Sequence, residues 1–114
     1  MKILVIDDDV LMCRTLARIL GAEGHDALTA PDSARGTALF HREQPEIVIA
    51  EGVEAILAMR RIGPSIKIIA IMEYGTEMLE TARLLGADDA IEKPFRTHEL
   101  VERVRTLGAT PTTN

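Results

Sequence analysis

The sequence predicts an α/β fold, a doubly wound five-stranded parallel sheet in the order 2-1-3-4-5 with helices on both faces. Apolar segments alternate with helical patterns along almost all of the 114 residues. Three segments are the continuous apolar runs typical of strands buried on both faces: KILVI at 2–6, EIVIA at 46–50 and IKIIAIM at 66–72. The intervening segments have the length of crossover helices, which make neighbouring strands parallel.

In the first half of the chain we expect two strands and two helices. The strand at 2–6 precedes a helix that Asp9 caps and that Gly21 or Gly24 ends. Apolar residues recur in this helix at helical spacing: Met12, Leu16, Ile19 and Leu20. Residues 25–30 form a weaker strand, HDALTA. Pro31 and Asp32 then open a helix through Glu43, whose inward face is expected at Ala34, Ala38 and Leu39.

The second half of the chain continues this alternation. A helix at 53–62 follows the strand at 46–50, and its buried face is drawn from Ile56, Leu57 and Met59 or Arg60. The strand at 66–72 precedes a helix from Thr76 to Gly86 with an inward face at Met78 or Leu79, Ala82 and Leu85. A very short strand at 90–91 precedes a helix at 97–107 that packs through Leu100, Val101 and Val104. These elements predict one domain at 1–107 and a flexible C-terminal tail at 108–114.

The composition argues against several classes of protein. With 18 acidic and 13 basic residues the formal net charge is −5, whereas a nucleic-acid-binding protein needs a basic surface. No run approaches the ~18 apolar residues that a membrane span needs, and the N-terminal run is too short for a signal peptide. The single cysteine, Cys13, cannot form an internal disulfide. We therefore expect a cytoplasmic protein that binds neither nucleic acid nor membranes.

Charged residues follow three of the predicted strands. Asp7 and Asp8 come directly after the first strand, Glu51 after the third and Lys93 after the last. In the predicted strand order these positions share one edge of the sheet, so the side chains converge. Three close carboxylates repel each other, which raises at least one pKa unless a cation such as Mg²⁺ lies among them. The alternative is a solvated turn that caps a helix, which is the role we expect for Asp9.

Three motifs resemble the response-regulator receiver domain of bacterial two-component signalling: VIDDD at 5–9, PEIVIAE at 45–51 and GADDAIEKPF at 86–95. The resemblance implies the flavodoxin-like strand order and a Mg²⁺ site in which Asp7 holds the ion through water and Asp8 ligates it. The carbonyl of Val53 would complete the metal shell, and Lys93 would contact a phosphoryl group on the residue at position 51. A cis Lys93-Pro94 bond is also implied. The implied partners are a histidine kinase, a phosphotransfer protein or a downstream effector.

The sequence departs from this family at the residues that carry phosphorylation and switching. Glu51 stands where the family has its phosphoacceptor Asp, and Met72 and Ala90 replace the family's hydroxyl and aromatic switch residues. Met72 cannot donate a hydrogen bond to a phosphoryl oxygen, and Ala90 has no ring to move. The segment between Glu51 and the next helix is about four residues shorter than the corresponding loop of the family. This is a large change, because such connections are usually only a few residues long. The position of the Val53 carbonyl is therefore open, and Mg²⁺ binding is expected to be weakened or absent.

These departures favour a stand-alone atypical receiver that acts through protein binding, is not an enzyme and is not switched by ordinary aspartyl phosphorylation. Partner contacts are expected at Tyr74, Arg96 and Arg103, and a homodimer is compatible with the sequence. Glu51 either imitates the phosphorylated state or abolishes it. One alternative is a Mg²⁺-dependent phosphoacceptor that uses Glu51. A less favoured one is a small Mg²⁺-dependent phosphohydrolase with Asp7 as nucleophile and Asp9 as acid, although Val10-Leu11 replaces that enzyme signature's Gly-Thr.

Overall fold

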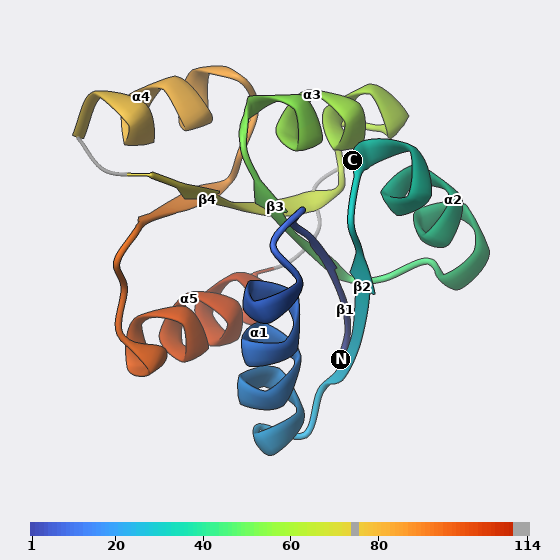
Figure 1. Cartoon of the computed structure of the whole chain (residues 1–114). Helices are drawn as coiled ribbons and strands as arrows, with labels where there is room; N and C mark the ends of the chain where they lie inside the picture. The colour runs from blue at the N-terminus through green and yellow to red at the C-terminus, as the bar shows by residue number, and fades with distance from the viewer. Residues whose placement is uncertain (74–75, 111–114) are drawn as a thin grey trace.

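The computed structural model describes residues 1–73 and 76–110, which form a three-layer α/β sandwich (Figure 1). The five strands are all parallel and lie in the order β2-β1-β3-β4-β5, as predicted. The strands are β1 (Lys2–Ile6), β2 (Asp26–Ala30), β3 (Ile47–Glu51), β4 (Lys67–Met72) and β5 (Asp89–Glu92). The helices are α1 (Val10–Ala22), α2 (Ser33–Glu43), α3 (Val53–Ile62), α4 (Thr76–Leu84) and α5 (Thr97–Ala109).

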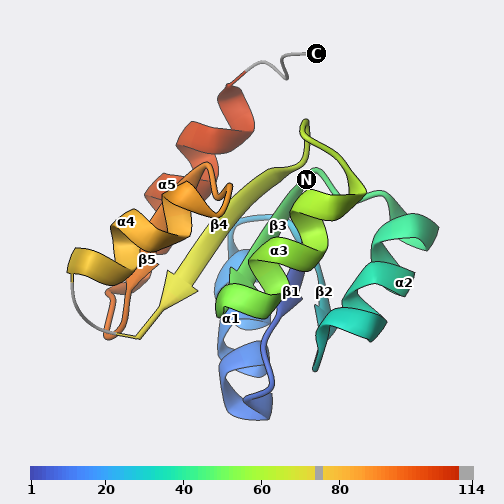
Figure 2. The same ribbon diagram turned by 90° about the horizontal axis from the view of Figure 1, so that it is seen from above.

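Two apolar layers, one on each face of the sheet, hold the helices in place. Helices α2, α3 and α4 cover one face through residues such as Phe40, Ile56 and Ala82. Helices α1 and α5 cover the other, where Leu16 and Leu100 are fully buried. Figure 1 shows the sheet between these two groups of helices, and Figure 2 looks onto the sheet from the side of α2, α3 and α4. Successive strand residues alternate between the layers because side chains of a strand point to opposite faces, so the central strands have to be apolar throughout.

The inward face predicted for α2 was wrong in part. Ala34 and Ala38 are exposed, whereas Gly36 and Phe40 are buried and Leu39 is half-buried. A Cβ atom at Gly36 would lie 2.5 Å from Cδ1 of Ile6, so the close packing of the helix against Ile6 of β1 depends on a residue without a side chain. Gly36 and Phe40 are four residues apart and therefore share one side of the helix.

The helix termini follow the predicted signals, with small differences in length. Asp9 caps α1, since its Oδ1 accepts hydrogen bonds from the backbone of Leu11 and Met12 at 2.9 and 3.3 Å. Helix α5 continues two residues beyond the predicted end of the domain, to Ala109, and Lys67 donates a hydrogen bond to the carbonyl of Thr110. Residues 111–114 of the predicted tail lie outside the described residues. Within the part of the chain that the structure describes, no helix is long and apolar enough to cross a membrane.

Candidate functional site

Three carboxylates converge where β1 and β3 end. The two strands are neighbours, with Ile6 paired to Ala50, so Asp7, Asp8 and Glu51 all emerge at the same edge of the sheet. One ligand oxygen from each of the three lies within 4.8 Å of the other two. Asp7 is buried, Glu51 half-buried and Asp8 exposed. The predicted convergence of these side chains is therefore present in the structure.

Asp7 is the one charged residue in the buried core among the described residues, with an exposed fraction of 3%. Its Oδ1 accepts a hydrogen bond from the backbone of Asp9 at 2.9 Å, but its Oδ2 is buried without any partner. Burial raises the pKa of this carboxyl group, while the Asp9 hydrogen bond and the charge of Lys93 act in the opposite direction. The pKa is raised as predicted, although burial contributes more than repulsion between the carboxylates. A buried, unpartnered oxygen beside two further carboxylates fits a hard divalent cation such as Mg²⁺.

Lys93 supplies the positive charge at this edge of the sheet. It follows β5, its peptide bond to Pro94 is cis as predicted, and its backbone N–H donates to Met72 at 2.8 Å. Its Nζ lies 3.8 Å from Oε1 of Glu51 and 3.9 Å from Oε1 of Glu73. Burial raises the pKa of Glu51, and the charge of Lys93 partly offsets that effect. The Lys93 ammonium is thus shared between two carboxylates.

Glu73 is a member of this site that the sequence analysis missed. It is the first residue after β4, so the argument that collected Asp7, Glu51 and Lys93 from the carboxyl ends of parallel strands applies to it as well. Its side chain is mostly exposed, which makes its contact with Lys93 weaker than a buried ion pair. Its presence increases the negative charge around a single ammonium group.

Asp9 and Cys13 have structural positions beside the cluster. The Asp9 side chain is occupied in capping α1, which leaves it outside the group of three converging carboxylates. The buried thiol of Cys13 lies 3.3 Å from the carbonyl of Asp7, to which it donates. Burial, followed by the negative charge of Asp7, raises the pKa of the thiol. A protonated thiol is a poor nucleophile, which agrees with the packing role expected for this residue.

A single residue, Gly52, connects β3 to α3 and places the start of that helix at the site. Gly52 has a φ of 89°, a backbone conformation that favours glycine. Its carbonyl already accepts from the backbone of Ile56 at 3.3 Å, so α3 begins at once and the carbonyl of Val53 belongs to its first turn. Carbonyl groups in a helix point along its axis towards the C-terminus. Val53 and Glu54 line a pocket of about 560 Å³ together with Asp7, Asp8 and Glu51.

Met72 and Ala90 are packed in the core on neighbouring strands. Both have an exposed fraction of 2% and belong to the apolar layer under α2, α3 and α4. Ala70 pairs with Ala90, and Met72 is the next residue of β4 on the same face. A flexible methionine side chain beside an alanine fills space in this layer.

The residues predicted to contact partners have different surroundings. Arg96 is exposed at the start of α5, where its backbone N–H donates to Glu99 at 3.4 Å. Arg103 is half-buried, and its Nη1 donates to Oδ1 of Asp89 at 2.6 Å and to the carbonyl of Ala90 at 3.3 Å. Arg103 therefore joins α5 to β5. Tyr74 lies outside the described residues.

Comparison with known proteins identifies the family. The family model of the response regulator receiver domain matches residues 3–105. The chain is 34% identical to a probable transcriptional regulator, ycf27, of Porphyridium aerugineum, over 93% of this chain and 47% of that protein. It is 29% identical to the response regulator MprA of Mycobacterium leprae, over 94% of this chain and 50% of that protein.

The chain thus spans about half the length of these relatives. Among solved structures, the receiver domain of NtrX from Brucella abortus superposes with a TM-score of 0.89 at 28% identity, over 96% of this chain and 99% of that one. The family model covers nearly the whole chain, and the acidic cluster and Lys93 lie at the expected edge of the sheet. The chain belongs to the response regulator receiver domain family of two-component signalling.

Proposed function

We propose that this receiver domain acts through protein binding and is not switched by ordinary aspartyl phosphorylation. The observation that carries the proposal is the contact of 3.8 Å between Glu51 Oε1 and Lys93 Nζ. In this family the residue at position 51 accepts the phosphoryl group and the lysine contacts it. Here the two side chains already form an ion pair without any modification. We propose no catalytic activity for the domain.

The longer side chain of Glu51 supports this proposal. One additional methylene group moves the carboxylate away from the position of an aspartate, and an error of about 1 Å in placement can lower a rate on the order of 10²-fold. The carboxylate carries one negative charge, whereas a phosphoryl group carries up to about two. Glu51 therefore offers Lys93 a permanent but weaker partner than a phosphorylated side chain would.

The buried pair Met72 and Ala90 supports the same conclusion. A phosphoryl group at position 51 would find no hydroxyl donor at position 72, because the methionine thioether is only a weak acceptor. A change in the site would also move no aromatic ring at position 90. Since both side chains fill the apolar layer under α3 and α4, they have a packing role that is independent of phosphorylation.

Mg²⁺ binding is proposed as a weakened property of the same site. Asp7, Asp8 and Glu51 would hold the ion, which when bound would neutralise part of their charge. The Val53 carbonyl is an unsuitable further ligand in this conformation, because it lies in the first turn of α3. A shell that loses one protein ligand keeps more water, and Mg²⁺ tolerates this at reduced affinity.

The proposed partners follow from the family. A histidine kinase, a phosphotransfer protein or a downstream effector would bind the domain, and a second copy of the chain is a further candidate. We propose a cytoplasmic location and no binding of nucleic acid by this domain itself, in keeping with its net charge of −5. One relative is named as a probable transcriptional regulator, and this chain matches only 47% of its length. If this domain belonged to a DNA-binding protein of that kind, we propose that a different domain of that protein would contact the DNA.

The proposal is tested by the intact mass of the protein after incubation with Mg²⁺ and acetyl phosphate, followed by peptide mapping. Wild type and Glu51→Gln should gain no phosphoryl group. The Glu51→Asp variant restores the side-chain length of the family's phosphoacceptor. It serves as the positive control, because it tests whether the other residues of the site can still support phosphorylation. A stable mass gain on Glu51 of the wild type would overturn the proposal and establish the alternative, a Mg²⁺-dependent phosphoacceptor that uses glutamate.

A further inference from the structure

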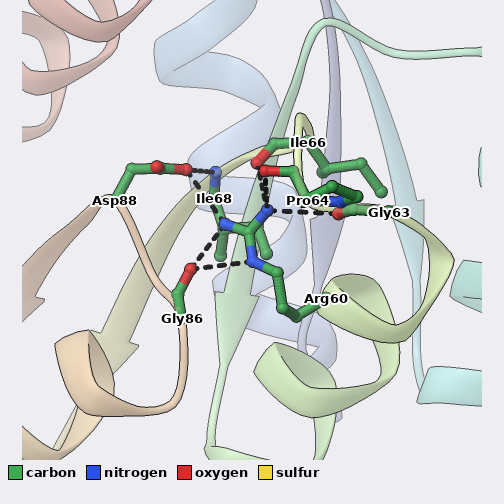
Figure 3. Close-up of polar contacts among 7 residues, drawn as sticks. All are labelled: Arg60, Gly63, Pro64, Ile66, Ile68, Gly86 and Asp88. Atoms are coloured by element: carbon green, nitrogen blue, oxygen red, sulfur yellow. Dashed lines mark hydrogen bonds and ion pairs between the residues drawn. The ribbon is translucent and has the colours of Figure 1, made fainter. Parts of the chain in front are cut away.

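The guanidinium group of Arg60 binds four separate backbone carbonyls and one carboxylate at the end of the sheet opposite the acidic site. Figure 3 shows this group, the Arg60 cluster, which consists of Arg60, Gly63, Pro64, Ile66, Ile68, Gly86 and Asp88. Arg60 lies near the C-terminus of α3, Gly63 to Ile66 connect α3 to β4, and Gly86 and Asp88 connect α4 to β5. The Arg60 side chain therefore joins α3, and the connection that directly follows it, to the α4–β5 connection 26 to 28 residues further along the chain.

The contacts use every nitrogen of the guanidinium group. On one side, Nε donates to the carbonyl of Gly86 at 2.9 Å, and Nη2 donates to the same carbonyl and to Oδ2 of Asp88 at 3.2 Å. On the other side, Nη1 lies 2.9 to 3.2 Å from the carbonyls of Gly63, Pro64 and Ile66, which share its two hydrogens. This arrangement needs the planar, forked donor set of arginine, since an ammonium group cannot face two sides at once.

Asp88 extends the cluster into the sheet. The same Oδ2 atom that contacts Arg60 accepts a hydrogen bond from the backbone of Ile68 at 2.7 Å, and the backbone N–H of Asp88 donates to the Ile68 carbonyl at 2.9 Å. The residue before β5 is thereby fixed both to β4 and to α3. The Arg60 side chain has an exposed fraction of only 21%, so its ionic contact is less screened than one at the open surface.

Two independent observations favour glycine at position 86. Its φ of 112° lies in a region that other residues rarely adopt. A Cβ atom there would also lie 3.0 Å from both Cγ and Nε of Arg60. The glycine lets the arginine side chain pass directly against the backbone that it binds, so the close approach is built into both partners.

We propose that Arg60 is a conformational tether that fixes the segment between α4 and β5, and with it the C-terminal end of α4, to α3. The segment can move relative to α3 only if the contacts on Gly86 and Asp88 open together. Because only Gly52 separates Glu51 from α3, the tether connects the α4–β5 side of the domain to the helix that starts at the acidic site. This inference does not depend on whether Glu51 accepts a phosphoryl group.

Amide hydrogen exchange of the full chain, resolved by NMR, tests the tether. The probes are the hydrogen-bonded amides of Gly86, Ala87 and Asp88, and the amide of Ile68. In Arg60→Lys and Arg60→Gln we expect these amides to exchange at least about tenfold faster, while those of β1 change less than about twofold. Arg61→Lys is the matched control, because Arg61 is the adjacent, exposed residue of the same helix.

Two outcomes would overturn the proposal. Unchanged exchange at the four probes in both Arg60 variants would mean that backbone contacts alone hold the segment. Equal acceleration at the probes and in β1 would mean that Arg60 contributes to global stability without any local tether. If Arg60→Gln does not fold, Asp88→Asn replaces it, since the asparagine keeps an oxygen for the Ile68 amide but loses the charge that pairs with Arg60.

Discussion

Replacing Asp7 with asparagine should stabilise the metal-free protein. The carboxylate is buried, one of its oxygens has no hydrogen-bond partner, and burial raises its pKa. In Asp7→Asn the amide oxygen can still accept from the Asp9 backbone, while the amide nitrogen can take the place of the unpartnered oxygen and donate towards the carboxylates of Asp8 and Glu51. The substitution thus removes a buried charge and turns a repulsive contact into an attractive one.

The size of the effect follows from the unpartnered atom. A buried polar group without a partner costs about 1–3 kcal/mol, so a gain of about 1–2 kcal/mol is expected. For a domain near this size, 1 kcal/mol corresponds to a shift of about 4 °C in Tm, which gives an increase of about 4–8 °C. Differential scanning calorimetry at neutral pH in the presence of EDTA measures this shift directly.

The control for this prediction is Asp26→Asn, which removes the same charge from an exposed position on β2. Its Tm should change by less than about 2 °C, since exposed substitutions usually change stability by less than ~0.5 kcal/mol. Added Mg²⁺ should reduce the difference between wild type and Asp7→Asn, because the ion neutralises the charge that the variant lacks. A Tm for Asp7→Asn in EDTA equal to or below that of wild type would refute the reasoning.

Three further predictions concern the site and the core. Burial raises the pKa of both Asp7 and Glu51, so the folded protein binds protons at these groups more readily than the unfolded chain does. The free energy of unfolding should therefore rise as the pH is lowered from about 7 through the folded pKa values. It should level off below the unfolded pKa values near ~4. Chemical denaturation at several pH values should show this component in wild type and its loss in Asp7→Asn/Glu51→Gln. Lys93→Met should raise the pKa of Glu51 further, as measured by NMR titration of its carboxyl group, and an unchanged pKa would show that the two charges do not interact. Gly36→Ala should destabilise the protein by about 1–3 kcal/mol through overpacking, whereas Gly21→Ala, which meets no atom within 4 Å, should stabilise it by up to ~1 kcal/mol; equal effects in urea denaturation would contradict the close contact of α2 with the sheet.

Local patterns in the sequence predicted the parallel sheet, and the resemblance to receiver domains implied its strand order. With that order, the acidic site followed from one topological rule. Continuous apolar runs identified the buried strands, and parallel strands bring their carboxyl ends to one edge. Asp7, Asp8, Glu51 and Lys93 could therefore be placed together without any knowledge of side-chain contacts. Glu73 satisfied the same rule and was missed because only strongly charged motifs were followed.

Other features depend on the distance between elements, which local spacing does not contain. The pattern favoured Ala34 and Ala38 over Gly36 in α2 because glycine counts little on a hydrophobic scale, yet the close approach to Ile6 needs a residue without a Cβ. Arg60 appeared only as an alternative to Met59 for the buried face of α3. Its hydrogen bonds to Gly86 join residues 26 positions apart in the chain, and no periodicity predicts such a contact.

The measurement that tests the central proposal most directly is the amide NMR spectrum of the wild type with Mg²⁺, recorded before and after addition of acetyl phosphate. Mass reports modification alone, whereas amide shifts report whether the domain changes conformation. We predict that the phosphodonor causes no shifts beyond those caused by Mg²⁺ in β4, β5 and α5, with Glu51→Asp measured in parallel as the variant that restores the acceptor. Phosphodonor-dependent shifts of wild-type amides in those elements would contradict the account and establish a phosphorylation switch at Glu51.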